Sequence, residues 1–359
     1  MKTDELKLIR TLFKIYYKCP DEQLIIPQIE KRELAIQPLD KDSMIRHLSF
    51  KSIEEFQKFI LQKVPGHVYY STAYYEDPGN PSMENKKWLG ADLVFDIDAD
   101  HLPTENCKLS NEAGVITLAC LEDAVNETLK LLDVLENELG FSKDEIRITF
   151  SGHRGFHVHV ESKEVQGLGQ EERRELIEYL HARLFDISRF IDSKNRLILG
   201  SGLAGSGGRI WNILKEIVDD KDIIDRAEKL KRLRKRQIEK LKKLNPEIEQ
   251  KLKIHVDEVV TLDLKRLIRV PNSLHGKTGL RVAQISKLDL EKGAEHILKI
   301  SIPKQFKKGM LKIVLLKKLT CPDVMGYSLP TNLDEVIKVP TFLAIYLIRR
   351  GLAYLVDET

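Results

Sequence analysis

Three stretches of the chain space their apolar residues as amphipathic helices do, with an apolar position every three or four residues. They are residues 1–18, 53–61 and 121–139. Ser52 precedes the second stretch and suits an N-cap, because a serine oxygen accepts a hydrogen bond from a free backbone N–H of the first turn. A last helix is expected at 342–350. The pattern therefore predicts helices at both ends of the chain and at two places between them.

Residues 93–100, LVFDIDAD, have the composition of a short buried strand flanked by turn residues. Side chains alternate along a strand, so Asp96 and Asp98 would point to one face and their apolar neighbours to the other. Two adjacent carboxylates repel each other unless a proton or a cation lies between them, and Mg²⁺ prefers such oxygen ligands. Alternatively, both are solvated residues at a strand end.

Residues 145–160, EIRITFSGHRGFHVHV, alternate apolar and polar positions on both sides of a glycine-containing turn. This pattern predicts two strands joined by a tight turn. His157 and His159 would lie on the face opposite the apolar residues. Glycine lets the backbone of the SGHRG turn approach a ligand closely, and Arg154 supplies a guanidinium suited to phosphate. The alternative is a plain hairpin with a zinc-binding histidine pair.

Residues 255–282 form the third informative stretch. We expect a strand end at 259–260, a short helix over 261–269 that Pro271 ends, and then a compact loop. The letters GKT suggest a phosphate loop, but such a loop needs a glycine five residues before Gly276, and none is there. A concentration of basic residues beside carboxylates remains, which indicates an anion site: Arg266, Arg269, His275, Lys277, Asp257 and Asp263.

The middle of the chain, residues 165–254, is helical in pattern. A glycine-rich stretch at 200–211 is expected to be a flexible connection. Residues 222–254 carry leucines at helical spacing among many lysines and arginines, which predicts a basic amphipathic helix. Such a face is either simply solvated or a contact for a nucleic-acid backbone.

The 359 residues include 58 basic and 55 acidic side chains, so the overall charge does not require a nucleic-acid or membrane partner. The hydrophobic share of 42% is typical of a soluble protein with a large core. The sequence shows no apolar run long enough for a membrane span and no signal-peptide core. Its four cysteines are too few for a disulfide scaffold and indicate a reducing, cytoplasmic setting.

Three motifs, in this order and spacing, resemble the catalytic small subunit of archaeal and eukaryotic DNA primases. They are D-I-D at 96–98, S-G-H-R-G-F-H at 151–157 and RLIRVPNSLHGKTG at 266–279. The resemblance covers residues 1–300 or so. One such motif would be weak, whereas three in register are highly specific.

The resemblance implies an α/β (α+β) fold, with a primase-type catalytic core of a mixed β-sheet flanked by helices and a helical insertion subdomain. We place the core at residues 1–164 and 255–359, and the insertion with its basic helix at 165–254. The implied activity is that of a nucleotidyltransferase, a DNA-directed RNA polymerase that makes short RNA or DNA primers on single-stranded DNA for replication.

By motif position, the resemblance implies that Asp96, Asp98 and Asp257 hold two Mg²⁺ or Mn²⁺ ions for nucleotidyl transfer. Asp257 is preferred to Asp263 because it lies eighteen residues before His275, the spacing of the family. The resemblance also implies a cradle for the phosphates of the incoming nucleotide, formed by Ser151, Gly152, His153, Arg154, His157, Arg269, His275 and Lys277.

One departure from the family concerns zinc. Family members commonly carry a zinc knuckle just after the aspartate strand, with three or four cysteine or histidine ligands. Here only Cys107 and Cys120 occupy that region, with His101 and Asp123 as candidate helpers. Two cysteines make a weak zinc site, so we expect the knuckle to be degenerate.

The resemblance further implies a heterodimer with the primase large subunit, a single-stranded DNA template, nucleoside triphosphates as substrates and a nucleoid-associated, cytoplasmic location. The alternatives are an end-joining-type repair polymerase of the same superfamily, a metal-dependent phosphohydrolase or nuclease, and a non-catalytic nucleic-acid-binding subunit. Two separate phosphate-binding stretches argue against the hydrolase, and three retained aspartates argue against the non-catalytic subunit.

Overall fold

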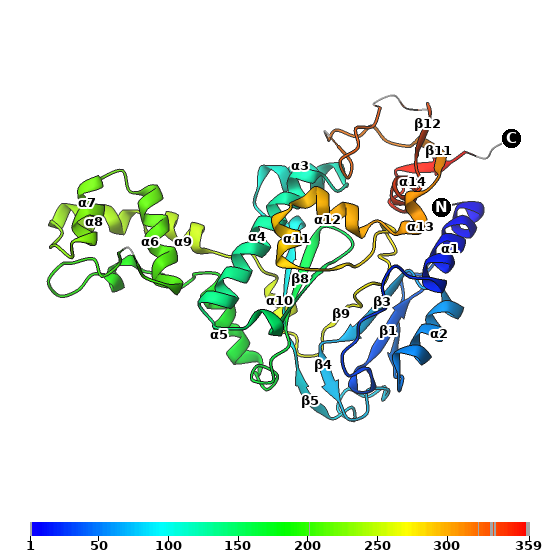
Figure 1. Ribbon diagram of the computed structural model, residues 1–359, viewed down its shortest axis with the longest axis horizontal. Coiled ribbons are helices and arrows are strands. Elements are labelled where there is room, and N and C mark those ends of the chain that lie inside the picture. Colours follow the sequence, from blue (N-terminus) through cyan, green and yellow to red (C-terminus); the bar gives the residue numbers. More distant parts are fainter. Residues whose placement is uncertain (1, 201, 322, 331–332, 334, 357–359) are drawn as a thin grey trace.

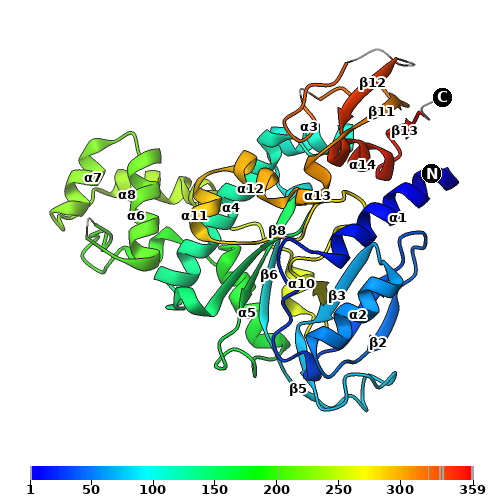
Figure 2. The same cartoon turned by 45° about the vertical axis from the view of Figure 1, so that its right-hand side comes forward.

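The computed structural model describes residues 2–200, 202–321, 323–330, 333 and 335–356. It confirms the expected α+β architecture. Two four-stranded sheets form the centre and helices cover them (Figures 1 and 2). A smaller helical lobe projects from this body, at the left of Figure 1.

The first sheet has the strand order β2-β1-β3-β9, and its three strand pairs are antiparallel. Its strands are β1 (Leu34–Gln37), β2 (Ile45–Leu48), β3 (His67–Ser71) and β9 (Leu267–Arg269). Helices α1 (Thr3–Lys18) and α2 (Ile53–Lys63) lie beside it, and both were expected. Helix α2 begins at the expected cap, where the Ser52 hydroxyl accepts a hydrogen bond from the N–H of Glu55 at 3.3 Å.

The second sheet has the order β10-β7-β8-β6 and is also antiparallel. Its strands are β6 (Leu93–Asp98), β7 (Ile146–Phe150), β8 (Gly155–Val160) and β10 (Gln284–Ile285). Instead of the single mixed sheet we expected, the core thus contains two antiparallel ones. The apolar face of the second sheet packs against α4 (Leu118–Asn137), which leaves the aspartate face of β6 directed away from that helix.

Two smaller sheets complete the body. They consist of β4 (Ala73–Tyr75) with β5 (Trp88–Ala91), and of β11 (Met310–Leu315) between β12 (Val336–Pro340) and β13 (Ala353–Leu355). The remaining helices of the body are α3 (Glu105–Ala113), α5 (Gln170–Leu180), α10 (Glu258–Leu262), α11 (Lys287–Glu291), α12 (Ala294–Ser301), α13 (Lys304–Lys307) and α14 (Thr341–Arg349). Short 3-10 helices are η1 (Ile29–Lys31), η2 (Ala99–His101) and η3 (Lys143–Glu145). No helix in the described ranges is both long and apolar enough to cross a membrane.

The projecting lobe has a hydrophobic core of its own, built from residues between 182 and 252 around the buried Trp211. Its elements are η4 (Ile187–Phe190), α6 (Gly205–Ile217), α7 (Lys221–Glu228), α8 (Lys235–Lys243) and α9 (Asn245–Leu252). Helix α5 instead packs on the main core through Ile177 and Leu180. The separate core of the lobe therefore starts after α5.

Two expectations for this lobe were wrong. The glycine-rich stretch 200–211 is partly helical, because α6 begins at Gly205 and buries Ile210 and Trp211 against the core of the lobe. The expected basic helix over 222–254 is broken into three. Leu230 adopts a left-handed backbone conformation (φ +47°) that ends α7, and a proline in the first turn of α9 marks a new start.

The expected order of strand and helix in residues 255–269 was also wrong. Residues 259–260 lie in α10, and the strand is β9 instead. The cause is tertiary, because β9 pairs antiparallel with β3, which lies far earlier in the chain. Helix α1 buries Ile9 and Phe13, while Ile15 is 47% exposed.

Candidate active site

Three aspartates from distant parts of the chain meet at one end of the second sheet. Asp96 and Asp98 are two residues apart on β6, so both lie on the face opposite α4. The backbone N–H of Asp257 donates a hydrogen bond to the carbonyl oxygen of Asp96 at 2.8 Å. Asp257 then caps α10, where its Oδ1 accepts a hydrogen bond from the N–H of Val259 at 2.9 Å. The fold thus brings together the carboxylates that the motifs had singled out.

The electrostatics of these carboxylates favour a bound cation. The pKa of Asp96 is raised from 3.8 to about 7, chiefly by burial and also by the charges of Asp98 and Asp257, while Arg269 and Arg266 act in the opposite direction. A divalent cation among these oxygens would relieve the repulsion between them. A set of three carboxylates, with oxygen donors only, suits a hard cation such as Mg²⁺ or Mn²⁺.

Asp96 opens into a groove of about 430 Å³ between the two central sheets. Its lining residues come from the β2 region, β3, β6, β8 and the segment from α10 to β9: Met44, Arg46, Tyr69, Asp96, His157, Val260, Asp263, Lys265, Arg266, Leu267, Ile268 and Arg269. Nε2 of His157 lies 3.9 Å from Oδ1 of Asp96. Burial, with a further contribution from Arg269, lowers the pKa of His157 to about 3, so its ring is neutral at pH 7. The lining of the groove therefore combines the carboxylates of Asp96 and Asp263 with several lysine and arginine side chains.

The SGHRG turn joins β7 to β8 beside this groove. The Ser151 hydroxyl accepts hydrogen bonds from the N–H groups of His153 and Gly155, at 3.3 and 3.2 Å, and so fixes the turn. Gly152 has a left-handed backbone (φ +74°), and a Cβ built there would lie 2.8 Å from Cβ of His275. Only glycine therefore allows this turn and the 272–279 loop to pack so closely.

This close packing assembles a stack of three histidines. The rings of His153 and His275 lie 5.2 Å apart and nearly parallel, and His67 of β3 meets His275 edge-on at 4.6 Å. Burial lowers the pKa of all three below the ordinary value, and Arg269 and Lys277 lower it further. The stack is therefore neutral at pH 7 and lies in a positive field, which suits an anionic ligand.

The sequence motifs did not identify His67, nor Arg350 after α14. Arg350 donates a hydrogen bond to the carbonyl oxygen of Gly114 at 2.6 Å, and its guanidinium lies 3.5 Å from Nε2 of His153. Neither residue stands in a motif. His67 follows a turn at the start of an aromatic strand, and Arg350 enters the site only because α14 folds back across the core. No local pattern would have found either one.

Arg154 is held by acidic and amide partners rather than pointing freely to the groove. It forms an ion pair with Asp100 and donates to Oδ1 of Asn111 at 2.8 Å. Asn111 in turn donates to the carbonyl oxygen of Asp100 at 3.1 Å. The SGHRG turn is thereby tied to α3, which follows the aspartate strand.

The two cysteines after the aspartate strand form a disulfide, Cys107–Cys120, which joins α3 to the start of α4. A disulfide sulfur has no thiolate to offer, so these residues are not zinc ligands in this structure. The candidate weak zinc site is therefore corrected to a covalent link.

A second group of residues, Asp92, His159 and Glu161, offers ligand atoms within 4.8 Å of one another and could hold a metal ion. Asp92 is already paired with the buried Arg32 at 2.6 Å, and Glu161 with Arg147. A divalent cation would therefore add uncompensated positive charge here. The Asp96 cluster is the better candidate for a divalent metal site.

Comparison with known proteins places this geometry in a family. Residues 95–286 match the family model described as DNA primase small subunit. The DNA primase small subunit PriS of Pyrobaculum islandicum is 41% identical over 340 residues, covering 95% of this chain and 96% of that protein. The corresponding protein of Archaeoglobus fulgidus is 34% identical over 352 residues, covering 96% of each.

Among solved structures, the polymerase domain of Mycobacterium tuberculosis ligase D in complex with DNA aligns over 82% of this chain and 88% of that one. Its identity is 12% and its TM-score is 0.39. The sequence matches to the primase subunits extend over nearly the whole chain, and they confirm the resemblance seen in the motifs. The chain therefore belongs to the DNA primase small subunit family.

Proposed function

We propose that this chain is the catalytic subunit of a DNA primase, a nucleotidyltransferase that joins nucleoside triphosphates on a single-stranded DNA template to make short primers. The observation that carries the proposal is the juxtaposition of the Asp96, Asp98 and Asp257 carboxylates with a stack of buried, neutral histidines that lies in the positive field of Arg269 and Lys277. Primer synthesis needs both parts. The carboxylates suit metal-assisted attack of a 3′-hydroxyl, and the histidine stack with its neighbouring cations suits a triphosphate.

In this proposal Asp96, Asp98 and Asp257 together hold two Mg²⁺ or Mn²⁺ ions. Such ions, when bound, lower the pKa of the attacking hydroxyl and neutralise charge on the leaving pyrophosphate. The three side chains supply anionic oxygens at a rigid strand end and helix start, so their positions are set by the fold. His157, neutral and 3.9 Å from Asp96, borders the same groove.

The triphosphate would lie against the SGHRG turn and the 272–279 loop. Its binding groups are Ser151, Gly152, His153, Arg154, His157, Arg269, His275 and Lys277, and we add His67 and Arg350 from the geometry. Backbone and imidazole N–H groups donate to phosphate oxygens, and the cations balance charge that builds up as pyrophosphate leaves. Binding the anion would also favour protonation of the histidines, whose pKa values are now depressed.

We further propose that the catalytic core comprises residues 1–164 and 255–359 and that the projecting lobe is an insertion within 165–254. The separate hydrophobic core of residues 182–252 supports this division. The proposed partners are a primase large subunit, with which the chain would form a heterodimer, and a single-stranded DNA template. Such an enzyme would act in the cytoplasm, on the chromosome.

The test is nucleotide incorporation on a single-stranded template with Mg²⁺ or Mn²⁺, with a primer supplied in one arm and the large subunit added in another. The Asp96→Ala, Asp98→Ala double variant should make no product. Asp263→Asn, an exposed carboxylate in the same groove, is the matched control and should retain activity. No product from the unaltered chain in any arm, or release of monophosphates instead of chains, would overturn the proposal.

A further inference from the structure

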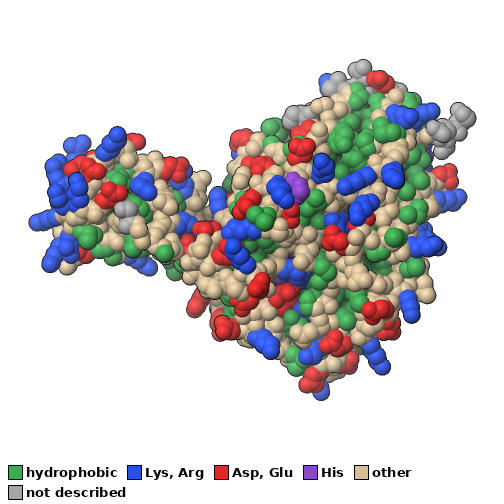
Figure 3. Space-filling view, in the orientation of Figure 1, with side chains coloured by type: hydrophobic (Ala, Val, Ile, Leu, Met, Phe, Trp, Pro, Cys, Tyr) green, Lys and Arg blue, Asp and Glu red, His purple; other side chains and the backbone are tan. Residues whose placement is uncertain are grey.

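The projecting lobe carries the positive charge of this chain. Residues 182–253 contain 19 lysines and arginines against 11 aspartates and glutamates, whereas the rest of the chain contains 39 against 44. The nearly neutral total therefore conceals a basic lobe attached to a slightly acidic body. In Figure 3 lysine and arginine side chains crowd the outer edge of this lobe. A local excess of this size attracts polyanions, and the attraction depends on salt.

Most of this charge lies along the turn between α7 and α8 and along α8 itself. We call it the basic ridge: Lys229, Lys231, Arg232, Lys235, Arg236, Lys242 and Lys243, all of them exposed. None of these side chains forms an ion pair with an acidic residue in the described part of the chain. Elsewhere in the lobe most arginines are paired, as Arg196 is with Asp192 and Arg226 with Asp222. The ridge therefore keeps its charge available for a partner.

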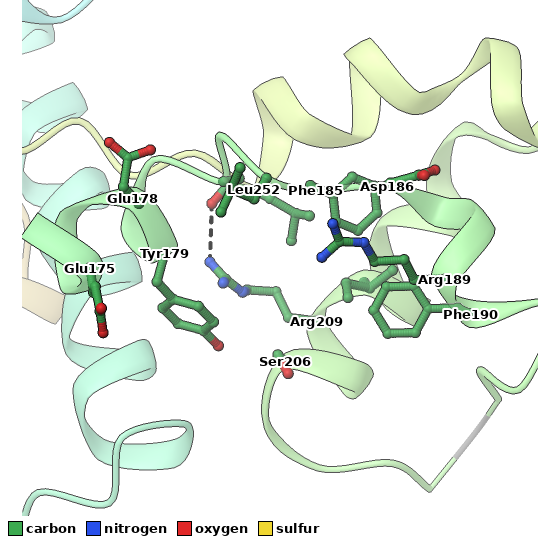
Figure 4. A pocket seen from close by; sticks show the side chains of 13 residues that line it. Glu175, Glu178, Tyr179, Phe185, Asp186, Arg189, Phe190, Ser206, Arg209 and Leu252 are labelled. Atoms are coloured by element: carbon green, nitrogen blue, oxygen red, sulfur yellow. Dashed lines mark hydrogen bonds between the residues drawn. The ribbon is translucent and has the colours of Figure 1, made fainter.

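A largely apolar pocket of about 440 Å³ lies where the lobe meets α5 (Figure 4). Tyr179 of α5 lies on one side of it, and Phe185 and Phe190 on the other, with ring centroids 6.1 Å apart. Arg189 lies beside the two phenylalanines in Figure 4, and its guanidinium has no hydrogen-bond or ion-pair partner among the described residues. Aromatic faces next to a free guanidinium suit a flat ring attached to an anion.

The pocket and the ridge adjoin each other. Helix α8 packs against η4, which carries both Arg189 and Phe190. At the rim, Asp186 has a pKa held below its ordinary value by hydrogen bonds from Ser188, with smaller contributions from Arg189 and from Lys242 of the ridge. A strand lying along α8 could therefore place a base in the pocket without leaving the ridge.

We propose that the lobe is a second binding site for single-stranded nucleic acid, separate from the groove at the aspartates. The ridge would follow the phosphates and the pocket would take an unstacked base. The acidic residues at the pocket agree with this path. Asp186 caps the 3-10 helix η4 by accepting a hydrogen bond from the N–H of Ser188, and Glu178 pairs with Arg183. Glu175, on α5, would repel phosphates and so favour a path along α8. The role of such a site, holding a template or a nascent primer, rests on the proposed primase function.

The first experiment measures binding of the full chain to a labelled oligothymidylate by fluorescence anisotropy, in EDTA so that no synthesis occurs. Lys235→Ala with Arg236→Ala removes two charges from the ridge. Lys51→Ala with Lys58→Ala removes two exposed charges near α2 and is the matched control. The ridge variant should bind several-fold more weakly, and its salt slope should be lower by about 0.7 for each phosphate that it no longer neutralises. Equal affinity and slope in the two variants would overturn the proposal.

The second experiment tests the pocket. Phe190→Leu keeps an apolar side chain in place but removes the stacking surface, and thermal melting checks that the lobe stays folded. The preference of the unaltered chain for oligothymidylate over an abasic strand should fall by about 5-fold or more in this variant. An unchanged preference would refute base binding there.

Parallel titrations with oligouridylate show whether template-like DNA or primer-like RNA is preferred, and duplex DNA should bind the pocket variant and the unaltered chain alike. The Asp96→Ala, Asp98→Ala variant separates the two proposals, since it should retain binding to the lobe while losing synthesis. If the lobe variants bind normally while that variant alone is inactive, the second site is refuted and the primase proposal stands.

Discussion

Replacing Asp96 with asparagine should stabilise the metal-free protein at pH 8 and at the same time abolish nucleotide incorporation. Asparagine has almost the same shape as aspartate but no charge, so it removes the repulsion from Asp98 and Asp257 without opening a cavity. A substitution that strengthens the fold and destroys activity identifies a residue that serves a ligand at the expense of stability.

The magnitude follows from the shift in pKa. The pKa of Asp96 is about 7 in the folded protein against 3.8 in a model peptide. Between pH 3.8 and about pH 7, Asp96 keeps its proton in the folded protein but has lost it in the unfolded chain. The free energy of unfolding therefore decreases as the pH rises through this range. A shift of about 3 units corresponds to a loss of up to about 4 kcal/mol by pH 8. The asparagine variant lacks this loss, and its advantage should vanish near pH 4.

The assay is urea denaturation at pH 4, 6 and 8 in EDTA, repeated with Mg²⁺ or Mn²⁺. Metal at a hundred times its dissociation constant should return about 2.7 kcal/mol to the unaltered protein and much less to the variant. Asp263→Asn, in the same groove, should show neither effect. Parallel losses of stability with pH in the Asp96→Asn and unaltered chains would refute this account of the carboxylate cluster.

Three further predictions concern the surrounding scaffold. Gly155→Ala would place a Cβ 2.2 Å from a carbonyl oxygen of β6, so denaturation should show a loss of about 1–3 kcal/mol, whereas Gly167→Ala, with open space around it, should be neutral. His275→Gln should raise the KM for nucleoside triphosphate about 10-fold with a smaller change in kcat in steady-state kinetics, and an unchanged KM would remove His275 from the phosphate site. Cys107→Ser should cost about 3 kcal/mol of unfolding free energy because the link to Cys120 is absent, and a reductant should lower the stability of the unaltered chain only.

The parts of the site that could be predicted from sequence are those set by local pattern. Composition predicted β6, and with it the shared face of Asp96 and Asp98, while alternation predicted β7 and β8. The assignment of β9 failed because its strand character comes from pairing with β3 far along the chain. His67 was missed for a similar reason, since its place beside His275 exists only once β3 and the 272–279 loop have met.

The shifts in pKa of the aspartate cluster and of the histidine stack have one common origin. Burial raises the pKa of Asp96 and lowers that of His153, and neighbouring charges of the same sign add to each shift. The aspartate cluster therefore favours a bound cation, and the histidine stack close to it favours a bound anion. A nucleoside triphosphate with its divalent metal carries both missing charges, and binding of either one should strengthen binding of the other. Because the two clusters lie on separate strands and loops that tertiary packing holds in place, this coupling needs no large conformational change.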